Sequence, residues 1–280
     1  MQDALIEGLI DSLKLLPYLF ITFLFLEIIE HKLSNKNEKL LRTNKKIGPV
    51  AGGLLGGLPQ CGFSAMASNL FSSRVITTGT LIAIFLSTSD EMLPIMLSEQ
   101  VNILVLLRIV GFKVLIGITV GYIIDLIFRK NEEEKKEHIH ELCEHENCHC
   151  EEEGVILSSV KHTLKIGLFI LIANLSINLI IYYIGEDNLK NLLLDKNIFT
   201  YFIASLIGLI PNCAASVIIT ELYLSGLITV GNLMAGLLTG SGLGLLLLFK
   251  TNKDLKENIK ILSIIYVVGV LVGIIVDLVI

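Results

Sequence analysis

The sequence predicts an all-α polytopic membrane protein of two inverted structural repeats, each with three spanning helices and one re-entrant or broken helical hairpin. Of its 280 residues, 53% are hydrophobic and only 18% are charged. The apolar residues fall in blocks of about 20, the length that a helix needs to cross a bilayer. The second half of the chain repeats the first, and most basic residues fall in a few loops. Composition, repetition and charge distribution together give this fold class.

Six apolar blocks are long enough to span a membrane, and two further apolar segments are interrupted by polar residues. We expect spans at about residues 9–29, 75–97, 101–128 and 155–184, with a fifth ending at 249 and a sixth at 280. The interrupted segments lie at about 47–71 and 198–223. The chain therefore divides into a first membrane repeat (1–130), an acidic loop rich in His and Cys (131–154) and a second membrane repeat (155–280).

Each interrupted segment contains the same short motif, Pro59-Gln60-Cys61 in the first half and Pro211-Asn212-Cys213 in the second. Proline removes a backbone donor and clashes with the preceding turn, so a helix breaks where it occurs. Broken backbone within a membrane is tolerated only where protein or a water-filled cavity covers it. Two such breaks at matching positions in two halves point to the substrate site of a transporter.

The two halves align without a gap at a constant offset of 152 residues, from Gly56/Gly208 to Leu126/Leu278, and 21 of these 71 pairs are identical. Shared apolar composition explains matched Leu and Ile, but not matched Pro, Cys, Thr, Gly and Asp. We interpret the match as an internal duplication. The pairs that support it are Pro59/Pro211, Cys61/Cys213, Ser64/Ser216, Thr77/Thr229, Gly79/Gly231, Ser89/Ser241, Gly117/Gly269, Gly121/Gly273 and Asp125/Asp277.

The distribution of basic residues predicts the topology. If each interrupted segment enters and leaves the membrane on the same side, the loops at 32–46, 72–75, 129–165 and 250–260 share one side and hold 17 of the 22 Lys and Arg. Basic loops remain cytoplasmic. We therefore expect a multi-pass plasma-membrane protein with both termini outside and the His/Cys loop in the cytoplasm. Full crossing by the interrupted segments is the alternative.

The hairpin tips supply the first candidate ligands. A cysteine at the N-terminus of a helix gains thiolate character, and the half-helix that ends at each tip offers free carbonyls at the negative end of its dipole. The plainer alternative is that both cysteines are small buried apolar residues. The candidates in the hairpins are Gln60, Cys61, Ser64, Asn212, Cys213 and Ser216, next to the breaks at Pro59 and Pro211.

A polar run in the middle of the 75–97 block supplies the charged candidates. Ionisable residues within a membrane are costly and mark functional sites, and Asp90 and Glu91 offer the hard oxygens that a divalent cation needs. The repeat places Gly242 and Leu243 opposite them, so the site is asymmetric. Alternatively, the span ends at Pro94 and leaves both acids at the interface. The candidates here are Ser87, Ser89, Asp90, Glu91, Thr239 and Ser241, of which the last two are equally suited to interhelical hydrogen bonds.

Other polar residues have weaker assignments. Glu27 and Asn178, within the first and fourth spans, fall nearly opposite each other in the repeat and are candidates for proton coupling or for interhelical contacts. A last group lies near segment ends, where capping or solvation is expected: Asn69, Glu221, Asp125 and Asp277.

The loop between the repeats carries four His and three Cys within residues 138–150. This is the composition of a short metal-capturing tract, although the cysteine spacing fits no zinc-finger template. A merely acidic linker would explain the glutamates of the loop but not these residues. The auxiliary metal ligands predicted here are His138, His140, Cys143, His145, Cys148, His149 and Cys150.

Three stretches of this sequence, LGGLPQCGFS (55–64), IFLSTSDE (84–91) and PNC (211–213), resemble the ten-helix heavy-metal exporter family. The resemblance covers nearly the whole chain, and ten helices would correspond to six spans plus four half-helices. Members of that family carry the labels manganese transporter or arsenic efflux protein, so the resemblance implies export of a metal or metalloid. Some members also carry an acidic motif in the second half, where this chain has Thr239-Gly240-Ser241-Gly242.

We expect a secondary-active exporter of a divalent cation, with Mn²⁺ first, because the intramembrane carboxylates would otherwise have no role. The cysteines keep open an exporter of arsenite, organoarsenicals or soft metals such as Zn, Cu, Co and Ni. A membrane metal sensor that does not transport would explain the His/Cys loop but not the duplicated hairpins. No phosphate-binding loop or hydrolase motif is present, so we do not expect an enzyme. The expected partners are the metal ion and lipid, without nucleic acid or a cofactor beyond the transported ion; a homo-oligomer is left open.

Overall fold

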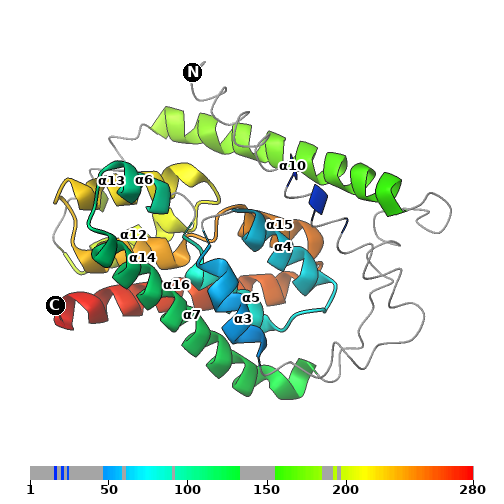
Figure 1. Ribbon diagram of the computed structural model, residues 1–280, viewed down its shortest axis with the longest axis horizontal. Coiled ribbons are helices and arrows are strands. Elements are labelled where there is room, and N and C mark those ends of the chain that lie inside the picture. Colours follow the sequence, from blue (N-terminus) through cyan, green and yellow to red (C-terminus); the bar gives the residue numbers. More distant parts are fainter. Residues whose placement is uncertain are drawn as a thin grey trace.

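The computed structural model describes residues 16–17, 20–21, 24, 47–58, 61–89, 92–132, 155–184, 192–193 and 197–279. These residues form helices joined by turns, without a strand among them, which confirms the predicted all-α class (Figure 1). In chain order the helices are α3 (Gly48–Gly56), α4 (Cys61–Ser72), α5 (Thr78–Ser87), α6 (Met92–Ser98), α7 (Ile103–Glu132), α10 (Val155–Ile184), α12 (Phe199–Gly208), α13 (Cys213–Leu224), α14 (Val230–Thr239), α15 (Leu243–Thr251) and α16 (Leu255–Val279).

Four segments are apolar and long enough to cross a membrane: Thr78–Ser98, Ile103–Phe128, Val230–Thr251 and Leu255–Val279. They coincide with four of the six predicted spans. The predicted span at 155–184 forms the 30-residue helix α10. Most of the first predicted span lies outside the described residues, but Leu16 within it packs against Gly167 of α10.

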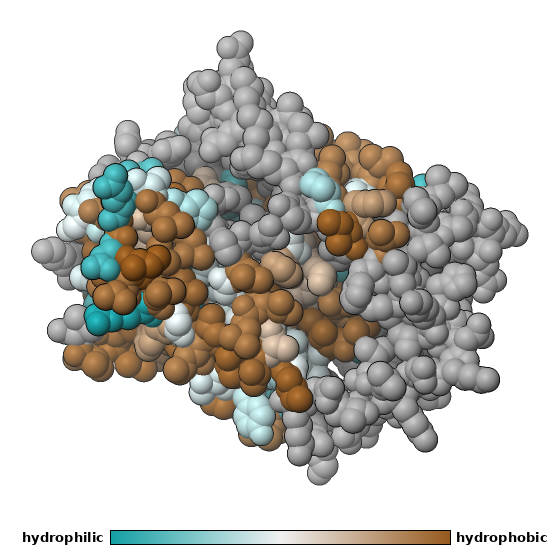
Figure 2. Space-filling model, in the orientation of Figure 1, coloured by the Kyte–Doolittle hydropathy of each residue, from teal (hydrophilic) through white to brown (hydrophobic). Residues whose placement is uncertain are grey.

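The long helices expose apolar side chains on one face and bury them on the other. On α7, Leu107 and Leu115 are more than half exposed, whereas Leu106 and Ile109 are buried. Figure 2 shows apolar side chains over much of the visible surface of the described residues. Apolar surface of this extent would be a liability in water and is typical of helices that lie against lipid.

Both interrupted segments are broken near their prolines, as predicted. The first gap separates α3 from α4, and the second separates α12 from α13. Pro211 lies in the second gap, followed by the extended backbone of Asn212. Pro59 lies in the first gap, outside the described residues.

The predicted spans at 75–97 and up to 249 keep the length and apolar composition of membrane spans, but each is divided into two helices, α5 with α6 and α14 with α15. In the first gap, Thr88 Oγ1 donates to the carbonyl of Ile84 (2.8 Å) and Ser89 Oγ donates to that of Ser87 (3.1 Å). Such local side-chain bonds compete with the helical ladder. In the second gap, Gly242 has a φ of 53°, a conformation that glycine adopts without strain.

Small residues let α7 approach α5 closely in the first repeat, and α16 approach α14 in the second. On α7, Gly117 and Gly121 face α5, and a Cβ at Gly121 would lie 2.9 Å from Ala83 Cβ and would overlap the carbonyl oxygen of Gly79. Two glycines four residues apart on one helix are a familiar seam for helix pairs in membranes. The equivalent seam between α16 and α14 involves Gly269, Gly273, Gly231 and Ala235.

A carboxylate ties the start of each divided span to the long helix that follows. Asp125 of α7 accepts hydrogen bonds from Gly79 N (2.7 Å) and from Thr77 Oγ1 (2.7 Å), the N-cap residue of α5. The second repeat has the same bonds at Gly231, Thr229 and Asp277. The expected capping role is confirmed for both aspartates.

The repeats interlock through two pairs of short helices. α4 of the first repeat packs against α15 of the second, and α6 of the first packs against α13 of the second (Figure 1). Ser68 Oγ donates to the carbonyl of Gly244 (2.6 Å), and the hydroxyls of Ser72 and Thr251 lie 2.6 Å apart. α4 therefore runs alongside α15 from the start of α15 to its end.

Basic residues gather at one end of the molecule. Arg74, after α4, forms a salt bridge of 2.8 Å with Glu257 in the first turn of α16. Lys260 Nζ lies 3.3 Å from the ring centroid of Phe128, near the end of α7. The turn after α4, the start of α16 and the end of α7 therefore lie together.

Candidate functional site

The break in the hairpin and the break in the divided span lie next to each other within each repeat. Gly56, the last residue of α3, packs so closely against α5 that an added Cβ would lie 3.0 Å from Ser87 Cβ. Gly208, at the end of α12, packs in the same way against Gly236 and Thr239 of α14. The helix ends that border the two breaks of one repeat are therefore in contact.

The hairpins of both repeats also reach the break between α14 and α15. A Cβ at Gly244, in the first turn of α15, would lie 2.7 Å from Ser64 Cβ, and one at Gly240 would lie 3.5 Å from Ser216 Oγ. Ser64 belongs to α4 and Ser216 to α13. Each half of the chain thus brings one predicted ligand to this break.

The four hydroxyl residues predicted at the span breaks, Ser87, Ser89, Thr239 and Ser241, are all at most 1% exposed. Thr239 Oγ1 donates to the carbonyl of Gly236 (2.9 Å), so its hydroxyl serves its own helix. Ser87 Oγ has no hydrogen-bond partner among the described residues. Buried hydroxyls without a partner are rare in folded proteins, and Ser87 can therefore donate or accept a further bond.

The ligands predicted in the hairpins are described in part. Asn212 is 6% exposed and precedes α13 without a capping bond from its side chain. Ser64 is buried and Ser216 is half-buried. Cys61 and Cys213 are the first residues of α4 and α13. Outside the described residues lie Pro59, Gln60, Asp90 and Glu91.

The predicted coupling pair and the metal-capturing loop stay predictions. Asn178 lies on α10, whereas Glu27 and the seven His and Cys ligands of residues 138–150 lie outside the described residues. Within the described part of the chain there is no group of three or more His, Cys, Asp or Glu that could hold a metal ion.

Asn69 was expected to be solvated or to cap a helix end, but its side chain is wholly buried. It lies on α4, which packs against α15 and α5. Both polar atoms of its carboxamide lack a hydrogen-bond partner among the described residues. Glu221, at the equivalent position of α13, is exposed as expected.

Lys113 of α7 is a residue of this site that the sequence analysis did not select. Its side chain is 0% exposed, and its ammonium donates to the carbonyl oxygens of Thr88 and, at 2.9 Å, Leu237. Thr88 follows α5 and Leu237 lies in the last turn of α14, so Lys113 contacts both divided spans. The signal that would have identified it is a single lysine in the middle of an apolar block.

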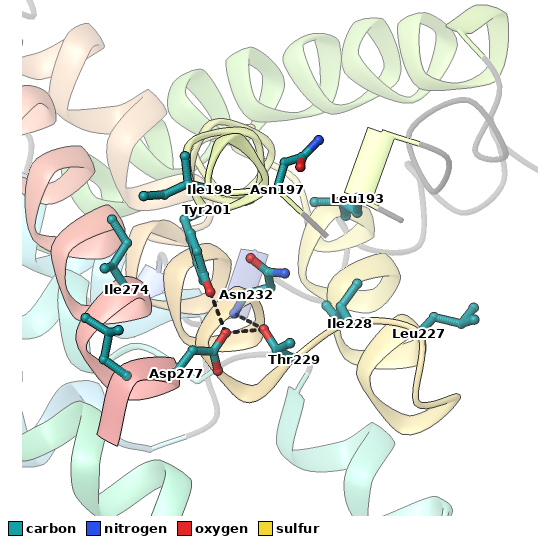
Figure 3. A pocket seen from close by; sticks show the side chains of 11 residues that line it. Leu193, Asn197, Ile198, Tyr201, Leu227, Ile228, Thr229, Asn232, Ile274 and Asp277 are labelled. Carbon is teal, nitrogen blue, oxygen red and sulfur yellow. Dashed lines mark hydrogen bonds between the residues drawn. The ribbon is translucent and has the colours of Figure 1, made fainter. Parts of the chain in front are cut away.

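A cavity of about 300 Å³ lies away from the breaks, between α12, the start of α14 and the end of α16 (Figure 3). Tyr201 donates to Asp277 (2.8 Å) beside Thr229, and Asn232 lines the same cavity. None of the predicted ligands lines it. Asp277, the carboxylate that lines this cavity, already accepts hydrogen bonds from Thr229 and Gly231 at the start of α14. We therefore do not assign this cavity to the substrate.

Helices of membrane-spanning length, divided at matching positions in the two halves of the chain, define a polytopic membrane protein. Breaks of this kind are typical of transporters. The sequence profile of the family described as "Putative, 10TM heavy-metal exporter" matches residues 1–183 and 175–280. The chain belongs to this heavy-metal exporter family, which confirms the resemblance of its motifs. Comparison with curated proteins and with solved structures gave no match.

Proposed function

We propose that this protein is a secondary-active transporter, and not an enzyme, that exports a divalent metal cation, with Mn²⁺ first, through a site at its four helix breaks. The observation that carries the proposal is the meeting of these breaks, with Gly56 against Ser87 and Gly208 against Thr239. Helix ends at a break leave carbonyls without partners, and transporters use such ends to hold ions. Membership of the family supplies the heavy-metal class of substrate.

The residue types around the breaks support a cation that prefers oxygen. Asp90 and Glu91 directly follow Ser89 in the sequence, and the buried residues Ser87 and Ser89 and the carbonyl of Thr88 belong to the same break. Carboxylates, hydroxyls and carbonyls are ligands that suit Mn²⁺. Cys61 and Cys213, at the starts of α4 and α13, favour the second candidate, a thiol-seeking substrate such as arsenite or a soft metal ion.

We also propose that the hairpins are re-entrant and the repeats inverted. Two contacts support this topology. Gly48, at the start of α3, packs against Thr80 near the start of α5, and α4 leads into α5 through residues 73–77, so both ends of the first hairpin lie at the start of α5. The end of α7 lies beside the start of α16 at Phe128 and Lys260, although these two helices are equivalent in the repeat. Equivalent helices that run in opposite directions are the mark of inverted repeats.

The test of transport is uptake of Mn²⁺, Zn²⁺ and arsenite into proteoliposomes by the wild-type protein and the Asp90→Asn variant. We expect Mn²⁺ flux that falls at least about tenfold in Asp90→Asn, because the amide lacks the charge that hard divalent cations require. Glu99→Gln, which removes an exposed carboxylate after α6, is the matched control and should leave the flux unchanged.

Other outcomes would favour other functions. Arsenite flux that ignores Asp90 but is lost in Cys61→Ser would identify the second candidate. A folded protein that carries none of the three substrates would contradict the transporter. Metal responses that depend on residues 131–154 but not on Asp90 or Cys61 would indicate a sensor.

The topology predicts that Ser72→Cys and Thr251→Cys form a disulfide that joins the two repeats. The hydroxyls of these residues lie 2.6 Å apart, within reach of two sulfurs. With a protease site inserted in residues 131–154, cleavage should give two fragments that stay linked by the disulfide in the oxidised double variant. The pair Ser98→Cys with Thr251→Cys is the control and should separate. In a background in which Cys143, Cys148 and Cys150 are replaced by Ser, membrane-impermeant maleimide should label Ser72→Cys from the cytoplasmic side alone, and labelling from outside would contradict the proposed orientation.

A further inference from the structure

Lys113 lies on the core-facing side of α7, in the same stripe as the buried residues Ile109 and Ile116. It is 0% exposed and near the middle of the candidate span Ile103–Phe128. An ammonium removed from water is costly unless other groups replace its hydration, and in a membrane protein such a residue marks a functional pathway. The groups that accept hydrogen bonds from the Lys113 ammonium therefore indicate its role.

The ammonium of Lys113 lies between the C-terminal ends of two broken helices. Its first acceptor, the carbonyl of Thr88, belongs to the C-cap residue of α5. Its second acceptor, the carbonyl of Leu237, loses its usual helical donor because Ser241 N donates to Thr239 O (2.9 Å) instead. Free carbonyls at two helix ends, each at the negative end of a dipole, form a site that attracts a cation.

Comparison with the equivalent position in the second repeat shows whether packing alone requires a lysine at position 113. The residue equivalent to Lys113 is Ile265 of α16, which is also 0% exposed. A long apolar side chain therefore fills this position in the second repeat, and packing alone does not require a lysine. The ionisable residues closest in sequence to Thr88 are Asp90 and Glu91, outside the described residues.

We propose that the Lys113 ammonium is a tethered cation that fills the site between the ends of α5 and α14 when no substrate is bound, and that the transported divalent cation must displace it. The inference rests on the proposed function, since it assigns the resting occupant of that same site. A built-in positive charge weakens the binding of a divalent cation and favours its release after transport. It also keeps the carbonyls of both divided spans paired when the site holds no metal.

The test is equilibrium binding of Mn²⁺ to the purified full-length protein in detergent, measured by calorimetry for wild type, Lys113→Met and Lys113→Gln. Both variants should bind Mn²⁺ at least about tenfold more tightly than wild type, because a repelling charge has been removed from the site. Lys113→Gln keeps a donor for the carbonyls without the charge, and it serves as the test should Lys113→Met not fold. Arg108→Met, which removes an exposed charge from the same helix, should bind as wild type does.

The outcomes separate this inference from the proposed function. Folded Lys113→Gln that binds Mn²⁺ as wild type does, or more weakly, would overturn the tethered cation, because a purely structural hydrogen bond predicts that result; Mn²⁺ binding by wild type would still stand. Mn²⁺ binding by neither wild type nor the neutral variants would count against both.

Discussion

Gly121→Ala is expected to destabilise the protein by about 2 kcal/mol or more, because the added methyl group has no room between α7 and α5. Its Cβ would overlap the carbonyl oxygen of Gly79 and lie 2.9 Å from Ala83 Cβ. Backbone cannot give way as a flexible side chain can, so the two helices would have to separate. Unfolding in detergent by a denaturant series would measure the loss, and the expression level of the variant should fall with it.

Gly111→Ala on the same helix is the matched control. No atom lies within 4 Å of the position that its Cβ would take. Replacing a helical glycine in open space should stabilise the helix by roughly 0.5–1 kcal/mol. If both substitutions changed stability alike, the close contact between α7 and α5 would be contradicted. Gly273→Ala should repeat the effect in the second repeat, where the Cβ would lie 2.7 Å from Ala235 Cβ.

The sequence was a good guide where a residue type acts on the backbone by itself. Proline excludes the helix at its own position, so the gaps between α3 and α4 and between α12 and α13 were predictable. The division of the spans after Ser87 and Thr239 was not, because Ser, Thr and Gly break a helix only when the surroundings favour it. The run Gly240-Ser241-Gly242 was the sequence signal for the second division, since glycine adopts the φ of 53° found at Gly242 without strain.

Contacts between segments that are far apart in the chain could not be predicted from the sequence either. The four-residue glycine spacing on α7 and α16 is readable as a packing seam, but the sequence does not say which helix faces it. Asn69 is buried on α4, a helix that packs against α15 of the other repeat. The two acceptors of Lys113 come from segments 25 and 124 residues away. Candidate ligands could thus be chosen from residue type and repeat position, whereas the lysine that joins the two divided spans required the structure.

Asp125→Ala should also destabilise the protein by about 3 kcal/mol. The carboxylate accepts from Gly79 N (2.7 Å) and Thr77 Oγ1 (2.7 Å), and hydrogen bonds to a charged group contribute about 1.5–3 kcal/mol each when they are lost. It also faces the positive N-terminal end of α5, which adds a favourable dipole interaction. Denaturant unfolding of the purified variant measures the loss, and Asp125→Asn, which keeps an acceptor without the charge, should lose less.

The same variant distinguishes a structural carboxylate from a substrate ligand. Asp125 meets the start of α5, whereas the proposed site lies where α5 ends, beyond Ser87. Folded Asp125→Asn should therefore bind Mn²⁺ with unchanged affinity, while Asp90→Asn should bind it weakly at nearly unchanged stability. Loss of Mn²⁺ affinity in Asp125→Asn would contradict this placement and would move the site from the helix breaks to the start of α5. Asp277→Asn extends the comparison, because its carboxylate serves the start of α14 in the same way and also accepts from Tyr201 (2.8 Å).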